Sequence, residues 1–291
     1  MRADIGIIGG SGLYDLDGMK NVKAVPVRTP FGSPSDAVVL GELDGVRVAF
    51  LSRHGQGHTL SPSEINYRAN VYALKSLGIR RLISVSAVGS MKESIKPGHV
   101  VLPDQFIDLT KRRASTFFEG GAVAHVAFGE PICPSLASHL SSTARSVGAT
   151  VHDGGTYVCI EGPQFSTKAE SLLYRQWGVS VIGMTNLPEA KLAREAELCY
   201  ATIALATDYD CWHETEEPVT VEAILATLRQ NVALAKRLLR AAAQSAAAGD
   251  ECVCQRALRD AIVTDPARIP AALRRKLAVV TDRLSPAKGK R

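Results

Sequence analysis

Two aspartates, Asp208 and Asp210, close an apolar run that begins at Cys199. The run is short and does not alternate between polar and apolar residues, which predicts a strand buried on both faces of a sheet. Side chains two residues apart in a strand point to the same side, so the two carboxylates lie together. A buried carboxylate is costly unless N–H groups satisfy it, and a purine with an amino group would supply such donors. The alternative is that one acid caps a helix and the other lies in a solvated turn.

A glycine-rich segment, Gly9-Gly10-Ser11-Gly12, follows the first apolar run of the chain. Glycines let the backbone approach an anion closely, and the Ser11 hydroxyl adds a donor, so the segment is a candidate phosphate cradle. Its spacing fits neither the dinucleotide-binding fingerprint nor a Walker loop. A tight turn without a ligand is the alternative.

Three further apolar runs end in residues that could hold the same anion. Arg53 and His54 follow the first run, Ser86 and Ala87 lie at the end of the second, and Thr185 follows the third. A guanidinium can bind an oxyanion through two hydrogen bonds, and the hydroxyls add further donors. Ligands of open α/β sheets gather at the carboxyl ends of the strands, so we expect these side chains to meet the glycine-rich segment at one site. The alternative is that Arg53 is a surface residue and that the His54 ring is packed in the protein.

Apolar runs alternate with amphipathic stretches of helical period, which indicates an α/β fold. The predicted strands are Ile5–Ile8, Val46–Leu51, Arg81–Ser86, His99–Leu102, Thr156–Ile160, Val179–Met184 and Cys199–Thr207. The predicted helices span residues 62–77, 135–147, 167–177, 188–197 and 219–245. We therefore expect a single domain over residues 1–249, with a central mixed, twisted β-sheet flanked by helices. A C-terminal helical extension with a basic tail would follow over residues 250–291.

The composition excludes several classes of protein. Hydrophobic residues make up 46% of the 291 positions, enough for a large core. The net charge is +5, but the basic excess is concentrated after Arg274, without the interleaved aromatic residues of a nucleic-acid-binding face, so no nucleic-acid partner is expected. Neither a signal-peptide pattern nor a membrane-spanning apolar run is found, so we expect a cytoplasmic protein without a membrane partner.

The six cysteines are few for the length and lack Cys-x-x-Cys spacing, which favours neither a disulfide framework nor a metal site. Cys159 and Cys199 lie in apolar runs and are expected to be small buried side chains. Cys252 and Cys254 form a Cys-x-Cys pair, which is a poor zinc motif without other ligands nearby. We expect free thiols at this pair; a disulfide between the two, or from one of them to another cysteine, is the alternative.

Seven segments together resemble the purine nucleoside phosphorylase family: Ile7–Gly12, Arg53–Gly55, Asn66–Asn70, Ser86–Ser90, Glu161–Phe165, Gly183–Thr185 and Ala206–Trp212. The resemblance covers residues 4–245. It implies a homotrimer, or a dimer of trimers, that cleaves S-methyl-5′-thioadenosine with phosphate as co-substrate and needs no cofactor. The implied products are adenine and 5-methylthioribose 1-phosphate, in methionine and purine salvage. A methylthioinosine or broad-specificity purine nucleoside phosphorylase is the alternative.

The same resemblance implies roles for individual residues. The implied phosphate-binding residues are Ser11, Arg53, His54, Ser86, Ala87 and Thr185. The implied substrate-binding residues are Phe165, Ser166, Ile182, Met184, Val221, Ile224, Leu225 and His125, of which His125 would enter a neighbouring subunit's site. Asp208 and Asp210 are the implied catalytic residues, which recognise N7 and the 6-amino group of adenine. In the 6-oxopurine enzymes of the family an asparagine typically stands in place of the first acid.

Two departures from the family pattern are mild. Ser11 and Ser86 stand where many members have threonine, which keeps the hydroxyl, and Val88 replaces a common cysteine.

The chemistry of N-glycosidic cleavage agrees with this arrangement. Breaking the bond leaves positive charge on the sugar and negative charge on the purine, so catalysis needs an acid at N7 and an anion near C1′. A protonated Asp208, with its pKa raised by burial and by Asp210, can be that acid. Hydrolysis by water and a non-catalytic purine-binding role are the competing functions. The phosphate donors argue against the first, and nothing in the sequence suggests a lost acid, as the second would require.

Overall fold

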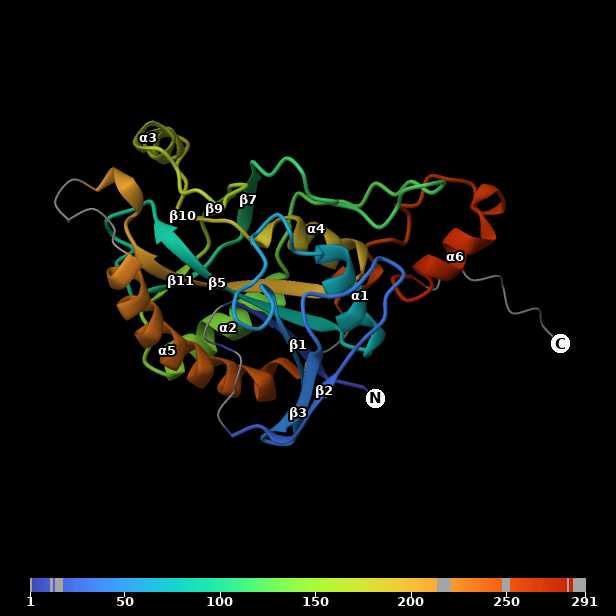
Figure 1. Cartoon of the computed structure of the whole chain (residues 1–291), viewed down its shortest axis with the longest axis horizontal. Helices are drawn as coiled ribbons and strands as arrows, with labels where there is room; N and C mark the ends of the chain where they lie inside the picture. Colours follow the sequence, from blue (N-terminus) through green and yellow to red (C-terminus); the bar gives the residue numbers. More distant parts are fainter. Residues whose placement is uncertain are drawn as a thin grey trace.

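A mixed sheet of 11 strands forms the centre of the computed structural model (Figure 1). The structure describes residues 2–10, 13, 18–213, 221–247, 252–281 and 283–284. The strands are β1 (Ile5–Gly9), β2 (Lys20–Val25), β3 (Val38–Leu43), β4 (Val46–Ser52), β5 (Arg81–Ser90), β6 (Val100–Leu102), β7 (Gln105–Asp108), β8 (Val151–Asp153), β9 (Thr156–Cys159), β10 (Val181–Gly183) and β11 (Cys199–Asp208). The single domain and the mixed, helix-flanked sheet expected from the sequence are confirmed.

The sheet branches at β5. Its main path runs β2-β3-β4-β1-β5-β10-β9-β7, while β11 pairs with β5 and β6, and β8 pairs with β6. One edge of β5 pairs in parallel with β11 over most of its length. The other edge is shared, because β1 pairs in parallel up to Ser84 and β10 pairs antiparallel from Gly89. The stretch of β5 between Ser84 and Gly89 therefore lies where three strand ends meet.

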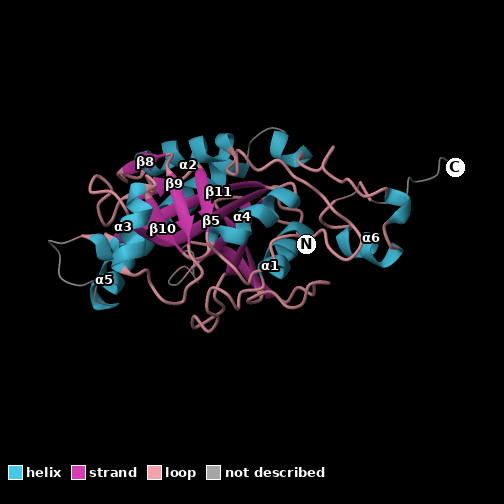
Figure 2. Cartoon of the chain, turned by 90° about the horizontal axis from the view of Figure 1, so that it is seen from above, coloured by secondary structure: helices cyan, strands magenta, loops and turns pink. Residues whose placement is uncertain are grey.

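Two pairs of helices pack around β11. The helices are α1 (Tyr67–Ser76), α2 (Pro134–Ser146), α3 (Lys168–Gln176), α4 (Asn186–Glu195), α5 (Val221–Ala247) and α6 (Ala271–Leu277). Helices α2 and α5 contact each other and β11. Helix α4 contacts β11 and α1, which lies next to it in Figure 2. Because helices of both pairs reach β11, every residue from Cys199 to Thr207 is buried, as its unbroken apolar run predicted. Among the described residues, every helix is too short or too polar to cross a lipid bilayer.

The structure corrects several predicted boundaries. The helix predicted from residue 62 begins only at Tyr67, because the Asn66 side chain accepts a hydrogen bond from Ala69 N and caps α1 there. Strands β2, β3, β7 and β8 were not predicted. Strand β2 is largely exposed, and β7 and β8 span only four and three residues. These three strands therefore carry no strong apolar period.

The C-terminal extension packs against the body of the protein (Figure 1). Its buried residues, among them Leu258, Leu273 and Leu277, belong to the same hydrophobic cluster as the sheet. Backbone hydrogen bonds join it to the loop before α2, where His125 N donates to Ala261 O at 2.8 Å and Val263 N to Val123 O at 3.0 Å. The division of the chain at residue 249 remains a prediction.

The extension also brings cysteines together. The spacing of Cys252 and Cys254 indicated no other ligands nearby, but two more cysteine side chains lie beside the pair. The sulfur atoms of these two residues and of Cys133 and Cys199 all lie within 4.8 Å of one another. The four residues are far apart in the sequence, so no local spacing could reveal the cluster.

Candidate active site

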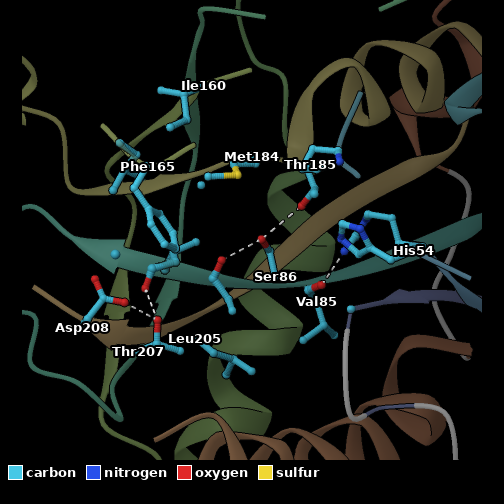
Figure 3. Close-up of a pocket in the computed structure, with 18 of the residues that line it drawn as sticks. His54, Val85, Ser86, Ile160, Phe165, Met184, Thr185, Leu205, Thr207 and Asp208 are labelled. Carbon is cyan, nitrogen blue, oxygen red and sulfur yellow. Dashed lines mark hydrogen bonds between the residues drawn. The ribbon is translucent and has the colours of Figure 1, made fainter. Parts of the chain in front are cut away.

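A cavity of about 370 Å³ opens where the strand ends meet. Residues of β5, β10 and β11 line it, together with residues from the segments that follow β1, β4, β9, β10 and β11 and with Val232 of α5. Figure 3 shows Asp208 at one end, His54 and Thr185 at the other, and Ser86 and Met184 between them. The cavity thus has an acidic end and an end with hydroxyl groups and a histidine ring.

Asp208 and Asp210 form the acidic end. Asp208 accepts two hydrogen bonds, from Thr207 Oγ1 at 2.6 Å and from the backbone N–H of Asp210 at 2.8 Å. Asp210 accepts one from Ser171 Oγ at 2.6 Å. Burial raises the pKa of both carboxyl groups, and for Asp208 the Asp210 charge adds a smaller contribution in the same direction. The alternative of turn-capping acids is partly right, since Asp208 does hold the turn to Asp210, yet both acids also line the cavity.

Hydroxyl groups from β5 and from the segment after β10 lie opposite the acids. Ser86 Oγ lies 3.3 Å from Thr185 Oγ1 and 3.3 Å from Tyr157 Oη. Thr185 reaches β5 because β10 runs antiparallel to it, so the residues after Gly183 turn back along Ser86 and Ala87. The meeting of Ser86 and Thr185 thus depends on the mixed character of the sheet, because β10 runs against β5. Ala87 is exposed and also lines the cavity.

His54 presents one defined ring nitrogen to the cavity. Its Nδ1 lies 2.9 Å from Leu60 O, and because a carbonyl oxygen can only accept, Nδ1 carries the proton. Burial lowers the pKa of His54 to about 4, so the ring is neutral near pH 7 and Nε2 is a hydrogen-bond acceptor. A neutral ring in this tautomer fits the O–H of a monohydrogen phosphate better than a bare oxyanion.

Arg53 is buried and ion-paired. Its side chain is 1% exposed, and Nε and Nη2 donate to the two carboxylate oxygens of Glu189 at 2.8 and 3.1 Å. Nη2 also donates to Ser84 Oγ at 2.7 Å, and Nη1 to Val85 O at 2.9 Å. The second Nη1 proton has no partner among the residues that the structure describes. The sequence predicted that Arg53 binds an anion through two hydrogen bonds. Because Arg53 is paired with Glu189, it has a single N–H left for a ligand in the cavity.

Apolar and small residues form the walls. Met184, Ile182 and Phe165 line the cavity, and the Phe165 side chain is 71% exposed. Ser166 lines it too, with a buried Oγ that has no hydrogen-bond partner among the described residues. Gly89 leaves room for the acid, because a Cβ there would lie 3.1 Å from Asp208 Oδ1.

Some of the predicted residues cannot be placed at the cavity. Ser11 lies outside the described residues. Val221, Ile224 and Leu225 fall in α5, but their side chains lie outside the described part of the structure. His125 is exposed and is not among the residues that line the cavity. Its proposed place in a neighbouring subunit's site remains a prediction.

Three residues at the site were missed by the sequence analysis. Glu189 balances Arg53, Ser171 holds Asp210, and Tyr157 contacts Ser86. Each lies on an element with an ordinary amphipathic or apolar pattern, so only its position in three dimensions reveals it.

Comparison with known proteins identifies the class. Residues 4–244 match the family model of the phosphorylase superfamily, and the chain belongs to this superfamily. Its relatives include an S-methyl-5′-thioadenosine phosphorylase of Geobacter sulfurreducens, 59% identical over 96% of this chain and 98% of the relative.

Solved structures resemble the chain over a similar extent. A methylthioadenosine phosphorylase from an antarctic soil metagenomic library has a TM-score of 0.92 and 51% identity, covering 96% of this chain and 99% of its own. The methylthioadenosine phosphorylase of Schistosoma mansoni in complex with adenine has a TM-score of 0.83 and 38% identity, covering 89% of this chain and 96% of its own.

Proposed function

We propose that this protein is an enzyme that cleaves S-methyl-5′-thioadenosine with inorganic phosphate, giving adenine and 5-methylthioribose 1-phosphate. The observation that carries the proposal is the cavity with two unlike ends. Asp208 lies at one end, and His54 and the Thr185 hydroxyl lie at the other (Figure 3). Asp210, which follows Asp208 by two residues, and Arg53, which precedes His54, also line the cavity. The similarity to S-methyl-5′-thioadenosine phosphorylases over nearly the full chain supports the same substrate.

The acidic end suits adenine. Protonated Asp208 donates its proton to N7 as the bond from C1′ to N9 breaks and the electron pair moves into the purine. Burial raises the pKa of Asp208, which keeps the carboxyl group protonated to a higher pH than in water. Asp210 accepts a hydrogen bond from the 6-amino group. A 6-oxopurine offers no donor at this position, so it is the poorer substrate.

The opposite end suits phosphate. Ser86 Oγ and Thr185 Oγ1, 3.3 Å apart, donate to neighbouring phosphate oxygens. His54 Nε2 accepts the phosphate O–H, and the remaining Nη1 proton of Arg53 donates to a further oxygen. The bound anion stabilises the positive charge that develops at C1′ and then forms the new bond to C1′. Met184, between the two ends, packs against the ribose.

The proposal extends to the assembly and the compartment. A homotrimer, single or paired, would place His125 of one subunit at the site of another, and this residue is exposed here as such a role requires. A cytoplasmic location suits the six cysteines, because thiols persist in a reducing compartment. Phosphate is a co-substrate in this scheme, and no catalytic cofactor is proposed.

A phosphate-dependence assay tests the reaction. Purified protein is incubated with methylthioadenosine while the phosphate concentration is varied, and adenine and methylthioribose 1-phosphate are measured. We expect the two products in equal amounts and base release that falls to the background rate without phosphate. Equal release in the absence of phosphate would mean hydrolysis, and no release at all would leave only a binding function.

Substrate comparison tests the base specificity. Methylthioadenosine, adenosine, methylthioinosine and inosine are compared by kcat/KM at saturating phosphate. We expect the 6-amino substrates to exceed their 6-oxo counterparts by at least about tenfold, since a site built for hydrogen bonds rejects an analogue that leaves them unmade. Similar values for all four would make the protein a broad-specificity purine nucleoside phosphorylase.

A further inference from the structure

Four cysteine side chains meet at the junction between the body and the C-terminal extension. Cys133 precedes α2, and Cys199 is the first residue of β11. In the extension, Cys252 precedes the short helical turn Val253–Arg256 and Cys254 lies within it. Their sulfur atoms all lie within 4.8 Å of one another, and Cys133 Sγ is 3.7 Å from Cys252 Sγ. None of the four lines the catalytic cavity.

The geometry is that of a ligand set for one ion. Zn²⁺ binds four thiolates at about 2.3 Å in a tetrahedron, which places the sulfur atoms about 3.8 Å apart. The measured 3.7 Å matches such an edge, and the 4.8 Å limit leaves room for a single ion but not for a multi-iron core. We propose that Cys133, Cys199, Cys252 and Cys254 bind one structural Zn²⁺ ion.

The surroundings suit a buried metal site. Cys133, Cys199 and Cys254 are at most 2% exposed, whereas Val253, between the two extension cysteines, is 81% exposed. The turn thus directs both of its sulfur atoms inward and the intervening side chain outward. Cys133 is also the N-cap residue of α2, where the helix dipole favours a thiolate. Four soft sulfur ligands select Zn²⁺ over Mg²⁺, Ca²⁺ or Mn²⁺.

The site would be structural because protein ligands fill all four positions. On binding, four thiols lose their protons to solvent and four Zn–S bonds form, with no transfer of electrons. The ion would hold the extension to the start of β11, whose other end carries Asp208, about 30 Å away at the usual rise of a strand. Metal loss should therefore change stability far more than catalysis.

Metal analysis of the intact wild-type chain is the first test. The protein is expressed with added zinc, purified with a reductant and without chelators, and its zinc and iron are measured by mass spectrometry. We expect about one zinc per chain. Release of that zinc by a thiol-specific mercurial, measured with a chromogenic chelator, would show that cysteines hold it. Co²⁺ reconstituted in its place should give sulfur-to-cobalt charge-transfer bands and the visible bands of a tetrahedral ion.

Variants then assign the ligands. Cys254→Ser and Cys199→Ser should each lose most of the zinc, and Cys211→Ser, an exposed cysteine outside the cluster, should keep it. A strong zinc chelator should lower the Tm of the wild type by more than about 5 °C while leaving that of Cys254→Ser nearly unchanged. Because the wild-type measurements need no variant, misfolding of a variant would not decide the matter.

Four results would overturn the proposal. The first is that wild-type protein contains no zinc even after it is refolded with added zinc, and the second is that it contains iron instead. The third is that the cysteine variants keep their zinc. The fourth is that the four cysteines form two disulfides. The last is read from thiol titration of the denatured, unreduced chain.

Discussion

At the scale of single residues, the catalytic role proposed for Asp208 comes with a cost in stability. Burial raises its pKa, so the folded state binds the proton more tightly than the unfolded chain. Its stabilising effect is therefore complete below the unfolded pKa of about 4 and is lost as the pH rises through the higher folded pKa. Above the folded pKa, the buried Asp208 carboxylate destabilises the protein without ligand.

The variant Asp208→Asn separates these two effects. It removes the acid, so kcat for methylthioadenosine should fall by about 10²-fold or more, and the preference should shift toward 6-oxopurines, because an amide can donate to O6. At a pH above the folded pKa of Asp208 it also removes a buried charge, so Tm without ligand should rise there and the gain should disappear as the pH is lowered. Steady-state kinetics on methylthioadenosine and on a 6-oxopurine nucleoside measure the catalytic effect, and calorimetry measures the change in Tm. Unchanged kinetics would remove Asp208 from the mechanism.

His54 gives the stability a second pH dependence, with the opposite sign. Its folded pKa of about 4 lies below the ordinary value of 6.5, so the unfolded state binds more protons as the pH falls between these values. Stability should fall by about 3 kcal/mol over this window through His54. The variant His54→Asn, which keeps a donor toward Leu60 O, should show a shallower loss. Denaturant unfolding measures the free energy of unfolding of both proteins from pH 7 to 4. An equal loss in the wild type and the variant would show that His54 does not cause this pH dependence.

At the scale of elements, the pair of Arg53 after β4 and Glu189 on α4 joins two parts of the site. Removing one partner leaves a buried charge, so Arg53→Met should cost about 3–5 kcal/mol. The double variant Arg53→Met/Glu189→Leu should regain much of this loss. If Arg53 also contacts phosphate, the phosphate KM of the double variant stays raised while the nucleoside KM changes little. A normal phosphate KM in the refolded double variant would make Arg53 purely structural.

Gly89 controls the distance between β5 and the acids at the end of β11. A Cβ at this position would lie 3.0 Å from Ile182 Cγ2 and 3.1 Å from Asp208 Oδ1. Gly89→Ala should therefore displace Asp208 and lower kcat/KM by about tenfold or more, as small misplacements of reacting groups do. Gly129→Ala is the control, because a Cβ there meets nothing within 4 Å. Equal activity of both variants would show that the acid tolerates the shift.

At the scale of the whole molecule, the proposed trimer makes His125 testable by subunit mixing. A mixture of His125→Ala and Asp208→Asn subunits would contain sites with both residues intact, provided that His125 acts in its neighbour's site. Exchange should therefore restore part of the activity. Mixing Asp208→Asn with Ser86→Ala is the control, since both residues line one cavity of the same chain and no intact site can form. Failure to recover activity despite verified exchange would contradict the shared site.

The sequence by itself determined the α/β class, the strands of the sheet centre and the acid pair. These features have local causes: an apolar run long enough for a buried strand predicts β1, β4, β5 and β11, and the acids lie directly at the end of one. The same holds for Ser86 and Thr185, since hydroxyl residues at strand ends are visible without a structure. Edge strands such as β2 were missed because an exposed strand carries no apolar pattern.

Only the tertiary structure decided which distant residues meet. Glu189 lies 136 positions from Arg53, and Cys252 lies 119 positions from Cys133. Neither pairing leaves a periodic or spacing signal, because the contacts are made by strands and helices that the chain connects through long crossovers. The antiparallel direction of β10 is likewise a property of the whole sheet. From the sequence, Arg53 is a residue available to an anion and Cys252 and Cys254 are free thiols. In the folded protein, the Glu189 carboxylate pairs with Arg53, and four cysteine sulfur atoms lie close together.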